Sequence, residues 1–396
     1  MKVGFSIDAY LTRRNIINIV ANYDYVKVHD INKILYRLAK INRKILNLSM
    51  PNAIDISYKF NDLNLNKVDL LHLFNSISYG KTPWVTSFES IVPRFRNAIE
   101  YLYGENCSCP STKKDRKILK ALETLSGKSC KKLIAISECS LNMQKDFLSH
   151  FPEHQSEIET KLICLHPPQK VCVENYENKR LPLNKQIHFM FVGDAFFRKG
   201  GVEMLEAFIE LRKSNHYNIK LTIVSSLTAD NYAIIKTIEE VEKTKEIINK
   251  NSNWIDYYSR LPNPQVIEIM KSAHVGLLPT YTDTYGFSVL EFQAMGCPVI
   301  STNVRALPEI NNNEMGWVIE IPRNRFGEAI YNPDTENKYK IGLAIKKELV
   351  NVISEIMENR DLISCKADKA IKHIRANHSP EEYSRKIGEI YSHALE

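Results

Sequence analysis

Residues 277–310, LLPTYTDTYGFSVLEFQAMGCPVISTNVRALPEI, are predicted to form a strand, a polar loop, a helix and a second strand. The apolar run Val275–Leu278 suits a strand that is buried on both faces, and Pro279 ends it. From Phe287 the apolar residues follow a helical spacing, until the Gly-Cys-Pro sequence at 296–298 ends the helix before a second apolar run begins. This order is typical of an α/β fold with a parallel sheet.

Two carboxylates lie on either side of the predicted helix start. Asp283 precedes the helix, Glu291 lies inside it, and Gly286 lets the backbone come close to a ligand. The N–H groups of the first turn, at Gly286, Phe287 and Ser288, favour an anion such as a phosphate, as does the helix dipole. A diphosphate at this helix terminus would have one carboxylate near a sugar and the other near a ribose. The alternative is that Asp283 caps the helix and Glu291 is solvated.

This stretch resembles the signature of glycosyltransferase family 4, the retaining GT-B enzymes that use nucleotide sugars. The family pattern has two glutamates separated by seven residues, with Gly-Phe-Gly between them and Pro-Val-Ile after the helix. One position departs from the pattern, because the first glutamate is Asp283 here and its side chain is one methylene shorter. The matching positions are Pro279-Thr280, Asp283, Gly286-Phe287-Ser288, Glu291, Ala294-Met295-Gly296, Pro298-Val299-Ile300 and Pro308-Glu309-Ile310.

The resemblance implies the GT-B fold, in which two Rossmann-like doubly wound domains face each other across a cleft. We expect residues 1–175 to form an acceptor-binding domain and residues 185–375 to form a nucleotide-sugar-binding domain. Residues 376–396 would form a helix that crosses back to the first domain. By analogy Glu291 would bind ribose hydroxyls and Asp283 would bind the donor sugar. The acceptor would be a glycan or a lipid-linked molecule, as in the synthesis of bacterial surface polysaccharide.

The composition is that of a globular protein with room for two domains. The chain has 396 residues, of which 44% are hydrophobic and 25% are charged, and its formal net charge is +7. This charge fits a protein that handles phosphates or touches an anionic membrane surface, and it equally fits an ordinary soluble protein. No apolar run is long enough to span a bilayer, and the N-terminal apolar segment is too short for a signal peptide. We therefore expect a cytoplasmic protein, with at most a peripheral contact with the inner face of the membrane.

In the first half of the chain, polar side chains follow predicted strands at the edge where ligands gather in doubly wound folds. His72 matches the histidine of a family Asp-x-x-His step, and the alternative is a hydrogen-bonded core histidine. The family's Thr-x-His-Asp step is Thr86-Ser87-Phe88-Glu89 here, which leaves Glu89 as the nearest polar candidate. Arg13 follows the first strand, where it could meet an anionic acceptor or simply be solvated. Glu89, His72 and Arg13 are thus the candidates for the acceptor or sugar side.

Residues 94–132 form the most basic part of the sequence, with interleaved aromatic residues. A functional interpretation is a surface that faces the acceptor or a membrane. The alternative is a solvated helical region. A nucleic-acid partner would need a recognisable binding module, and the sequence has none.

In the second half, an apolar strand at 188–192 leads through Gly193 to the basic turn Arg198-Lys199-Gly200-Gly201 and a helix. A strand, a basic turn and a helix N-terminus together form an anion site, and the alternative is an ordinary cationic turn on the surface. Lys199 matches a family lysine, whereas the family arginine is Asp194 here and Arg198 supplies the second cation. Leu261, which precedes another predicted helix, completes the donor-binding candidates together with Gly193.

The end of the chain has a strong helix signal. Ser379 is a predicted N-cap, followed by Pro at the first helical position and Glu382 at the third. Tyr383, Ile387, Ile390, Tyr391 and Ala394 then fall on one helical face.

The family resemblance implies a glycosyl transfer with retention at the anomeric carbon. The departing diphosphate carries charge in the transition state, so its stabilisation dominates the chemistry. Arg198, Lys199 and the amides near Gly286 would supply that stabilisation, with Asp283 as the third catalytic candidate. The sequence has no Asp-x-Asp motif and the family resemblance points the same way, so we expect neither a metal nor another cofactor.

The cysteines do not change this expectation. Cys107 and Cys109, with Cys130 and Cys139, could suggest a metal site, but the first pair is too close for a CxxC knuckle. Two other functions remain open on the sequence. One is an epimerase or a pyridoxal-dependent phosphorylase of the same architecture. The other is a non-catalytic nucleotide-sugar-binding protein, suggested by Asp283, Phe88 and Asp194.

Overall fold

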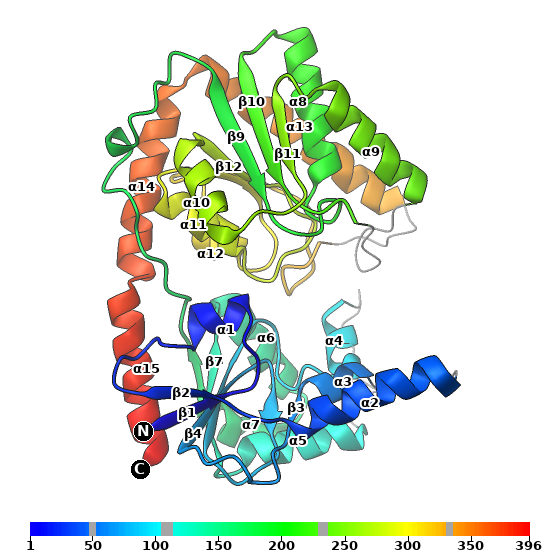
Figure 1. The fold of residues 1–396 in the computed structure, drawn as a ribbon, viewed down its shortest axis with the longest axis vertical. Helices are drawn as coiled ribbons and strands as arrows, with labels where there is room; N and C mark the ends of the chain where they lie inside the picture. Colours follow the sequence, from blue (N-terminus) through cyan, green and yellow to red (C-terminus); the bar gives the residue numbers. More distant parts are fainter. Residues whose placement is uncertain (47–52, 104–113, 229–236, 330–335) are drawn as a thin grey trace. The chain divides into compact units, whose positions relative to one another are not determined.

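We describe a computed structural model of the chain, which covers residues 1–46, 53–103, 114–228, 237–329 and 336–396. Two compact units make up the fold, and the first is discontinuous in sequence. Unit 1 comprises residues 1–168 and 378–396, and unit 2 comprises residues 169–377. Each unit is built around its own six-stranded parallel sheet (Figure 1). The predicted fold class, α/β with two doubly wound domains, is confirmed in this respect.

The sheet of unit 1 has the strand order β2-β1-β4-β6-β7-β8. Its strands are β1 (Lys2–Phe5), β2 (Asp24–Lys27), β4 (Leu70–Phe74), β6 (Trp84–Phe88), β7 (Cys130–Ala135) and β8 (Leu162–Cys164). A separate pair consists of β3 (Lys59–Phe60) and β5 (Ile77–Ser78). The helices are α1 (Tyr10–Asn15), α2 (Ile31–Leu46), α3 (Ala53–Ser57), α4 (Arg96–Tyr103), α5 (Arg116–Ser126), α6 (Glu138–Leu148), α7 (Pro152–Glu159) and α15 (Pro380–Leu395).

The sheet of unit 2 has the strand order β11-β10-β9-β12-β13-β14. Its strands are β9 (Ile187–Val192), β10 (Ile219–Val224), β11 (Ile255–Tyr258), β12 (Val275–Leu278), β13 (Val299–Thr302) and β14 (Trp317–Ile319). The helices are α8 (Gly201–Ser214), α9 (Ile238–Lys250), α10 (Asn263–Ser272), α11 (Phe287–Ala294), α12 (Leu307–Ile310), α13 (Glu336–Glu358) and α14 (Asp361–Asn377). β12 is buried along its whole length, as its apolar sequence predicts.

Helix α15 begins where the capping signal predicts and belongs to unit 1. The Ser379 hydroxyl accepts a hydrogen bond from the backbone N–H of Glu382, at 3.2 Å. The apolar face of the helix packs on the core of the sheet, where β1, β4, β6 and β7 contribute Val3, Leu70, Val85 and Ile134. Tyr383, Ile387, Tyr391 and Ala394 are buried there, and Ile390 is partly buried. The last segment of the chain therefore completes the core that the first segment begins.

Within the described residues, no helix combines the length and the apolar character needed to cross a membrane.

Candidate functional site

The candidate site of unit 2 lies where the strand order of its sheet reverses. The chain runs from β9 outward to β10 and β11, and it then returns to β12 on the other side of β9. At such a switch point the loops after two adjacent parallel strands diverge, and ligands bind beyond their carboxyl ends. The two loops are residues 193–200, after β9, and residues 279–286, after β12. The sequence patterns predicted an anion site in both loops, and the fold brings them together.

Two glycines make close contacts here sterically allowed, one within the first loop and one between the two loops. Gly193 has a φ of +148°, and a Cβ there would lie 2.9 Å from Cδ and Cε of Lys199. Gly200 has a φ of +75°, and a Cβ there would lie 2.0 Å from the carbonyl oxygen of Pro279. Any side chain at either position would clash and strain the backbone. Gly193 thus acts by giving the Lys199 side chain room to cross the loop.

Asp283 makes two kinds of contact in this loop. Its Oδ1 accepts hydrogen bonds from the backbone N–H groups of Tyr285 and Gly286, at 3.2 and 2.9 Å. Its Oδ2 accepts one from Nζ of Lys199 at 2.6 Å, in an ion pair that is largely shielded from solvent. Burial raises the pKa of the Asp283 carboxyl, but Lys199, Arg198 and the Tyr285 amide together outweigh burial and hold that pKa below its ordinary value. Asp283 is therefore held as a carboxylate that faces the basic turn.

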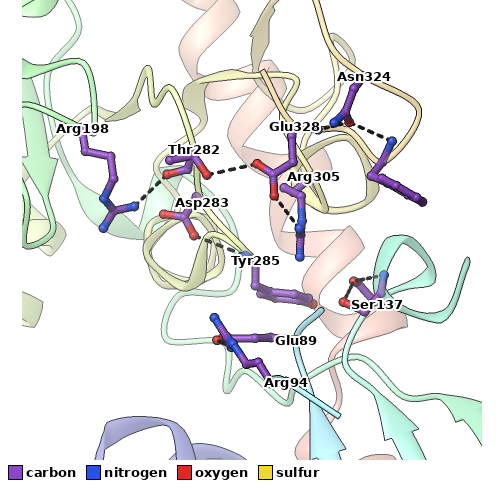
Figure 2. Close-up of polar contacts among 12 residues, drawn as sticks. Glu89, Arg94, Ser137, Arg198, Thr282, Asp283, Tyr285, Arg305, Asn324 and Glu328 are labelled. Atoms are coloured by element: carbon purple, nitrogen blue, oxygen red, sulfur yellow. Dashed lines mark hydrogen bonds and ion pairs between the residues drawn. The ribbon is translucent and has the colours of Figure 1, made fainter. Parts of the chain in front are cut away.

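Arg198 adds a second cation to the same place. Its guanidinium donates through Nη1 to the carbonyl oxygen of Thr282, at 2.9 Å (Figure 2). Its own carbonyl oxygen accepts from the backbone N–H of Tyr281, at 3.0 Å, so the two loops are joined by backbone as well as by side chains. Arg198 and Lys199 bring two positive charges next to Asp283, while the second carboxylate of these loops, Asp194, is exposed. Cationic side chains beside a helix N-terminus favour a bound anion.

Helix α11 begins at this cluster. Gly286 is its N-cap, with a φ of +90°, and a Cβ there would lie 2.4 Å from Cδ2 of Leu307. Phe287 and Ser288 form the first turn and are half-buried. Glu291 lies one turn further on and is only 8% exposed. A buried carboxylate differs from the solvated glutamate considered as the alternative in the sequence analysis.

A buried ion pair that the sequence analysis missed lies behind the loop. Nη1 of Arg305 lies 2.5 Å from Oε1 of Glu328, and the two side chains are 1% and 6% exposed. The second carboxylate oxygen of Glu328 accepts from the Thr282 hydroxyl, at 3.2 Å. The only signal for it in the sequence is a pair of charged residues 23 positions apart, and such a separation follows no secondary-structure period.

Leu261 lies at the carboxyl end of β11, two strands away from β9. It is half-buried and lines a surface hollow of about 380 Å³. The lining is mainly apolar and consists of Tyr258, Leu261, Pro264, Gln265, Glu268 and Ile269. The structure thus places Leu261 in a concave surface of unit 2, apart from the charged cluster.

The three candidates in unit 1 differ in accessibility. Glu89 is buried beyond the end of β6, where it forms an ion pair with Arg94 and bonds with Asn75. Arg13 is exposed on α1 and pairs with Asp8, at 2.5 Å. His72 is fully buried, and we set it apart below.

His72 corresponds to the alternative considered for it, a hydrogen-bonded core histidine. Its Nδ1 lies 2.7 Å from the Tyr391 hydroxyl, and its Nε2 lies 2.9 Å from the Ser87 hydroxyl. Burial lowers the pKa of His72 to about 3, so the ring is neutral at physiological pH. Both ring nitrogens are engaged within unit 1, so we leave His72 out of the proposed site.

Among the described residues, no group of three or more His, Cys, Asp or Glu side chains could hold a metal ion. Cys130 is buried, and burial raises the pKa of its thiol to about 12. Cys107 and Cys109 lie outside the described residues.

Comparison with known proteins places these features in a family. The sequence profile of the group 1 glycosyl transferases matches residues 173–331. That range contains both loops, from Gly193 and Lys199 to Asp283 and Glu291, together with Arg305 and Glu328. Residues 173–331 therefore form a group 1 glycosyl transferase region. The protein is a glycosyltransferase, as the sequence resemblance predicts, and its donor is a nucleotide sugar.

Individual glycosyltransferases are only distant relatives. The capsular polysaccharide biosynthesis glycosyltransferase CapM of Staphylococcus aureus is 30% identical over 139 residues, which are 35% of this chain and 34% of CapM. An uncharacterised glycosyltransferase of Methanocaldococcus jannaschii is 23% identical over 371 residues, covering 86% of this chain and 89% of that protein. Among solved structures, HepE of Anabaena in complex with UDP and glucose has a TM-score of 0.58 at 11% identity, and the match covers 99% of each chain. The HepE comparison confirms the GT-B fold.

Proposed function

We propose that this glycosyltransferase transfers a sugar from a nucleotide-sugar donor, with retention, to a glycan or lipid-linked acceptor in the synthesis of a bacterial surface polysaccharide. Unit 2 would bind the donor and unit 1 the acceptor. The observation that carries the proposal is the joined pair of loops at the switch point of unit 2, where Arg198, Lys199 and Asp283 meet the N-terminus of α11. The capsular role of CapM, which is 30% identical over part of the chain, supports the polysaccharide product.

The proposed mechanism assigns each group a task. Arg198 and Lys199 bind the donor diphosphate, and they stabilise the negative charge that it gains as the bond to the sugar breaks. Backbone N–H groups at the start of α11, near Gly286 and Ser288, add their partial positive charge. Asp283 orients the sugar through its hydroxyl groups, and Glu291 contacts the ribose. These cationic and amide groups would stand in for a divalent cation, so activity should survive EDTA.

Calorimetry on two variants tests the phosphate site. Replacing Arg198 and Lys199 together with alanine removes both cations and leaves Asp283 without its ion-pair partner. The affinity for the nucleoside diphosphate should fall by about 2–5 kcal/mol, the range for removing one side of a desolvated charge pair. Lys213→Ala, which removes an exposed cation from the last turn of α8, is the matched control and should leave affinity unchanged. Equal affinity of the double variant and the control would refute the assignment.

The donor can be identified with the wild-type protein. UDP-, GDP- and ADP-linked hexoses would be incubated without an acceptor, and slow release of the free sugar would be measured. Because HepE, which shares the fold, holds UDP and glucose, we expect a UDP-linked hexose to react fastest. Binding of a nucleotide sugar without release of sugar over a long incubation would favour a non-catalytic binding protein.

We also propose a peripheral contact between unit 1 and an anionic membrane surface, through α2 and not through the basic segment 94–132. In the described part of that segment, the cations Arg94, Arg96 and Lys117 form ion pairs with acidic side chains. Helix α2 instead exposes three aliphatic side chains, because Ile34, Leu35 and Leu38 are 50–53% exposed. The sequence of α2 has no acidic residue, and Arg37 is exposed beside these side chains, which complements anionic lipid head groups.

Vesicle sedimentation tests this contact. The full chain should sediment with vesicles that contain phosphatidylglycerol and stay in solution with pure phosphatidylcholine. The triple variant Ile34→Ser/Leu35→Ser/Leu38→Ser should lose binding. Leu65→Ser is the control, because Leu65 is 75% exposed but lies outside α2. Equal sedimentation of the triple variant and the wild type would exclude α2 as the contact.

A further inference from the structure

The buried pair of Arg305 and Glu328 is built by an unusual local arrangement. Arg305 has a φ of +49°, which is rare for a residue with a side chain, and its backbone N–H donates to the carbonyl oxygen of Gly327, at 2.8 Å. The turn that carries Glu328 is held by Asn324, whose side-chain oxygen accepts from the N–H groups of Phe326 and Glu328, at 2.9 and 3.0 Å. The backbone segments that carry Arg305 and Glu328 are thus each held by their own hydrogen bonds, independently of the ion pair.

From this pair a continuous chain of hydrogen bonds runs to the basic turn. Oε1 of Glu328 binds Arg305, and Oε2 accepts from the Thr282 hydroxyl. The carbonyl oxygen of Thr282 in turn accepts from the Arg198 guanidinium. Figure 2 shows the four side chains in sequence, with Asp283 next to Thr282. Thr282 therefore connects a buried ion pair to Arg198, and it directly precedes Asp283 in the chain.

We propose that Arg305 and Glu328 are positioning residues for glycosyl transfer, which act through Thr282 to hold Arg198 and Asp283 in their productive orientation. This inference rests on the proposed function of Arg198 and Asp283. A buried ion pair adds little net stability, because desolvation offsets the attraction, but its directional hydrogen bonds can fix geometry. Glu328 also neutralises Arg305, so the buried cation does not draw the diphosphate away from Arg198. In this proposal the Arg305–Glu328 pair fixes the position of the loop that carries Thr282, and Arg198 and Lys199 bind the anion.

Thr282→Val is the most selective test. Valine has nearly the same shape but lacks the hydroxyl, so the bond to Glu328 is lost while the ion pair and the Arg198–carbonyl bond can remain. With the nucleotide sugar that the wild type hydrolyses fastest, we expect kcat to fall about ten- to a hundredfold, the range for misplacement of a reacting group by about 1 Å. KM and the affinity for the matching nucleoside diphosphate should change far less. Thr282→Ser keeps the hydroxyl and should restore most of kcat.

Two further variants separate positioning from general stability. Thr222→Val removes a buried hydroxyl of the same kind, which lies 2.8 Å from Nε2 of His188, in the middle of β10. This control should lower Tm and leave kcat unchanged. Glu328→Gln keeps the volume of the side chain and removes its charge, and it should reduce kcat in the same direction as Thr282→Val.

Arg198→Ala, measured in parallel, distinguishes the inference from its premise. If Arg198→Ala loses nucleoside diphosphate affinity while Thr282→Val and Glu328→Gln keep the wild-type kcat, the positioning role is wrong and the donor site stands. If Arg198→Ala keeps both affinity and kcat, the proposed donor site itself is wrong. A fall in kcat for Thr222→Val equal to that for Thr282→Val would also overturn the inference, because the effect would then be one of stability.

Discussion

At the residue scale, Asp283 unites two interpretations that were alternatives in the sequence. One carboxylate oxygen accepts backbone N–H groups and shapes the turn before α11, as a capping residue would. The other oxygen faces Lys199, as a residue of an anion site would. Asp reaches both because the turn and the lysine lie on opposite sides of one short side chain. Although the Asp283 side chain is shorter than the family glutamate, both of its carboxylate oxygens have hydrogen-bond partners in this structure.

Asp283→Asn separates these contacts. Asparagine keeps an oxygen for the turn but has no charge for Lys199, so about 1.5–3 kcal/mol of stability should be lost, the value of a hydrogen bond to a charged group. Turnover should fall sharply, because the sugar would lose its orienting carboxylate, while nucleoside diphosphate affinity should change little. Turnover, calorimetry and Tm on one preparation provide the measurement. Full activity in the asparagine variant would mean that Asp283 only shapes the turn.

His72 gives the stability of unit 1 a pH dependence. Its pKa is about 3 in the folded chain, against 6.5 for a solvent-exposed histidine, so the unfolded chain takes up the proton first as pH falls. The contribution of His72 to the free energy of unfolding is constant above about pH 6.5, and it becomes unfavourable for folding as the pH falls from 6.5 to 3. At pH 5 it should amount to ~2 kcal/mol for this residue. Urea unfolding at pH 7 and pH 5 measures it, and His72→Gln should show a smaller difference. An unchanged pH dependence in the variant would contradict this origin.

The sequence proposed individual donor-site residues but not the groups that hold them. Lys199 and Asp283 were proposed because each belongs to a short motif that contains a glycine. Arg305 and Glu328 were missed because two distant charges have no period, and only the fold brings them together. For His72 the sequence left two interpretations open, since burial decides between them and a single histidine carries no signal of burial.

At the element scale, the strand–turn–helix units follow the sequence closely, and the differences have physical causes. Helix α11 was expected to present one apolar face, yet six of its eight residues are buried, including Glu291 and Gln293. The reason is that α11 lies against the sheet strands β12 and β13 and also against α14. Edge strand β2 was not predicted, because most of it is exposed and no apolar run marks it. A periodic sequence pattern identifies an element with one buried face. It does not identify a helix that is buried on most sides, such as α11, or a strand that is mostly exposed, such as β2.

The turn after β9 requires a residue without a Cβ at position 193, and Gly193→Ala tests this requirement. A Cβ would lie 2.9 Å from Cδ and Cε of Lys199, and the φ of +148° is unfavourable for alanine. We expect a loss of about 1–3 kcal/mol of stability. Nucleoside diphosphate affinity should also fall about tenfold or more, because Lys199 is displaced from Asp283.

Gly388→Ala is the matched control for this prediction. Gly388 lies inside α15 with a φ that suits any residue, and its added Cβ would meet only Cγ1 of Val20, at 3.5 Å. Alanine should be neutral or slightly stabilising there, because it favours the helix. If Gly193→Ala behaved like Gly388→Ala in calorimetry and thermal unfolding, the steric argument would be wrong.

At the scale of the whole molecule, the fold class followed from one motif and a few buried strands, because parallel doubly wound sheets repeat the same strand–turn–helix unit. The course of the chain between the units is set by packing. Unit 1 receives α15 because its sheet has an apolar surface that the helix covers. The helix is predictable from its cap and its period, whereas its place on the first domain was expected only from the family resemblance.

Deleting residues 378–396 should therefore affect the two units unequally. The deletion uncovers a core in which Tyr383, Ile387 and Tyr391 are buried, each worth ~1.5–3 kcal/mol of burial, a large part of the stability of a domain. Hydrogen exchange should show β1, β4, β6 and β7 losing protection while β9, β10 and β12 keep it. Removal of the exposed Glu396 alone is the control and should change little. Full protection of β1 and β4 in the larger deletion would show that unit 1 does not need the helix.

The discontinuity of unit 1 also has a consequence during translation. The ribosome makes residues 1–168 first, but α15 emerges only after the whole of unit 2. Unit 2 is about 200 residues long, so at ~5–20 residues per second the nascent unit 1 waits roughly 10–40 s with the apolar surface around Val3, Leu70 and Val85 uncovered. Unit 2 can close its own core in that interval. The part of the chain that is synthesised first is thus the part whose folding finishes last, and chaperones that bind apolar surface have their longest access to it.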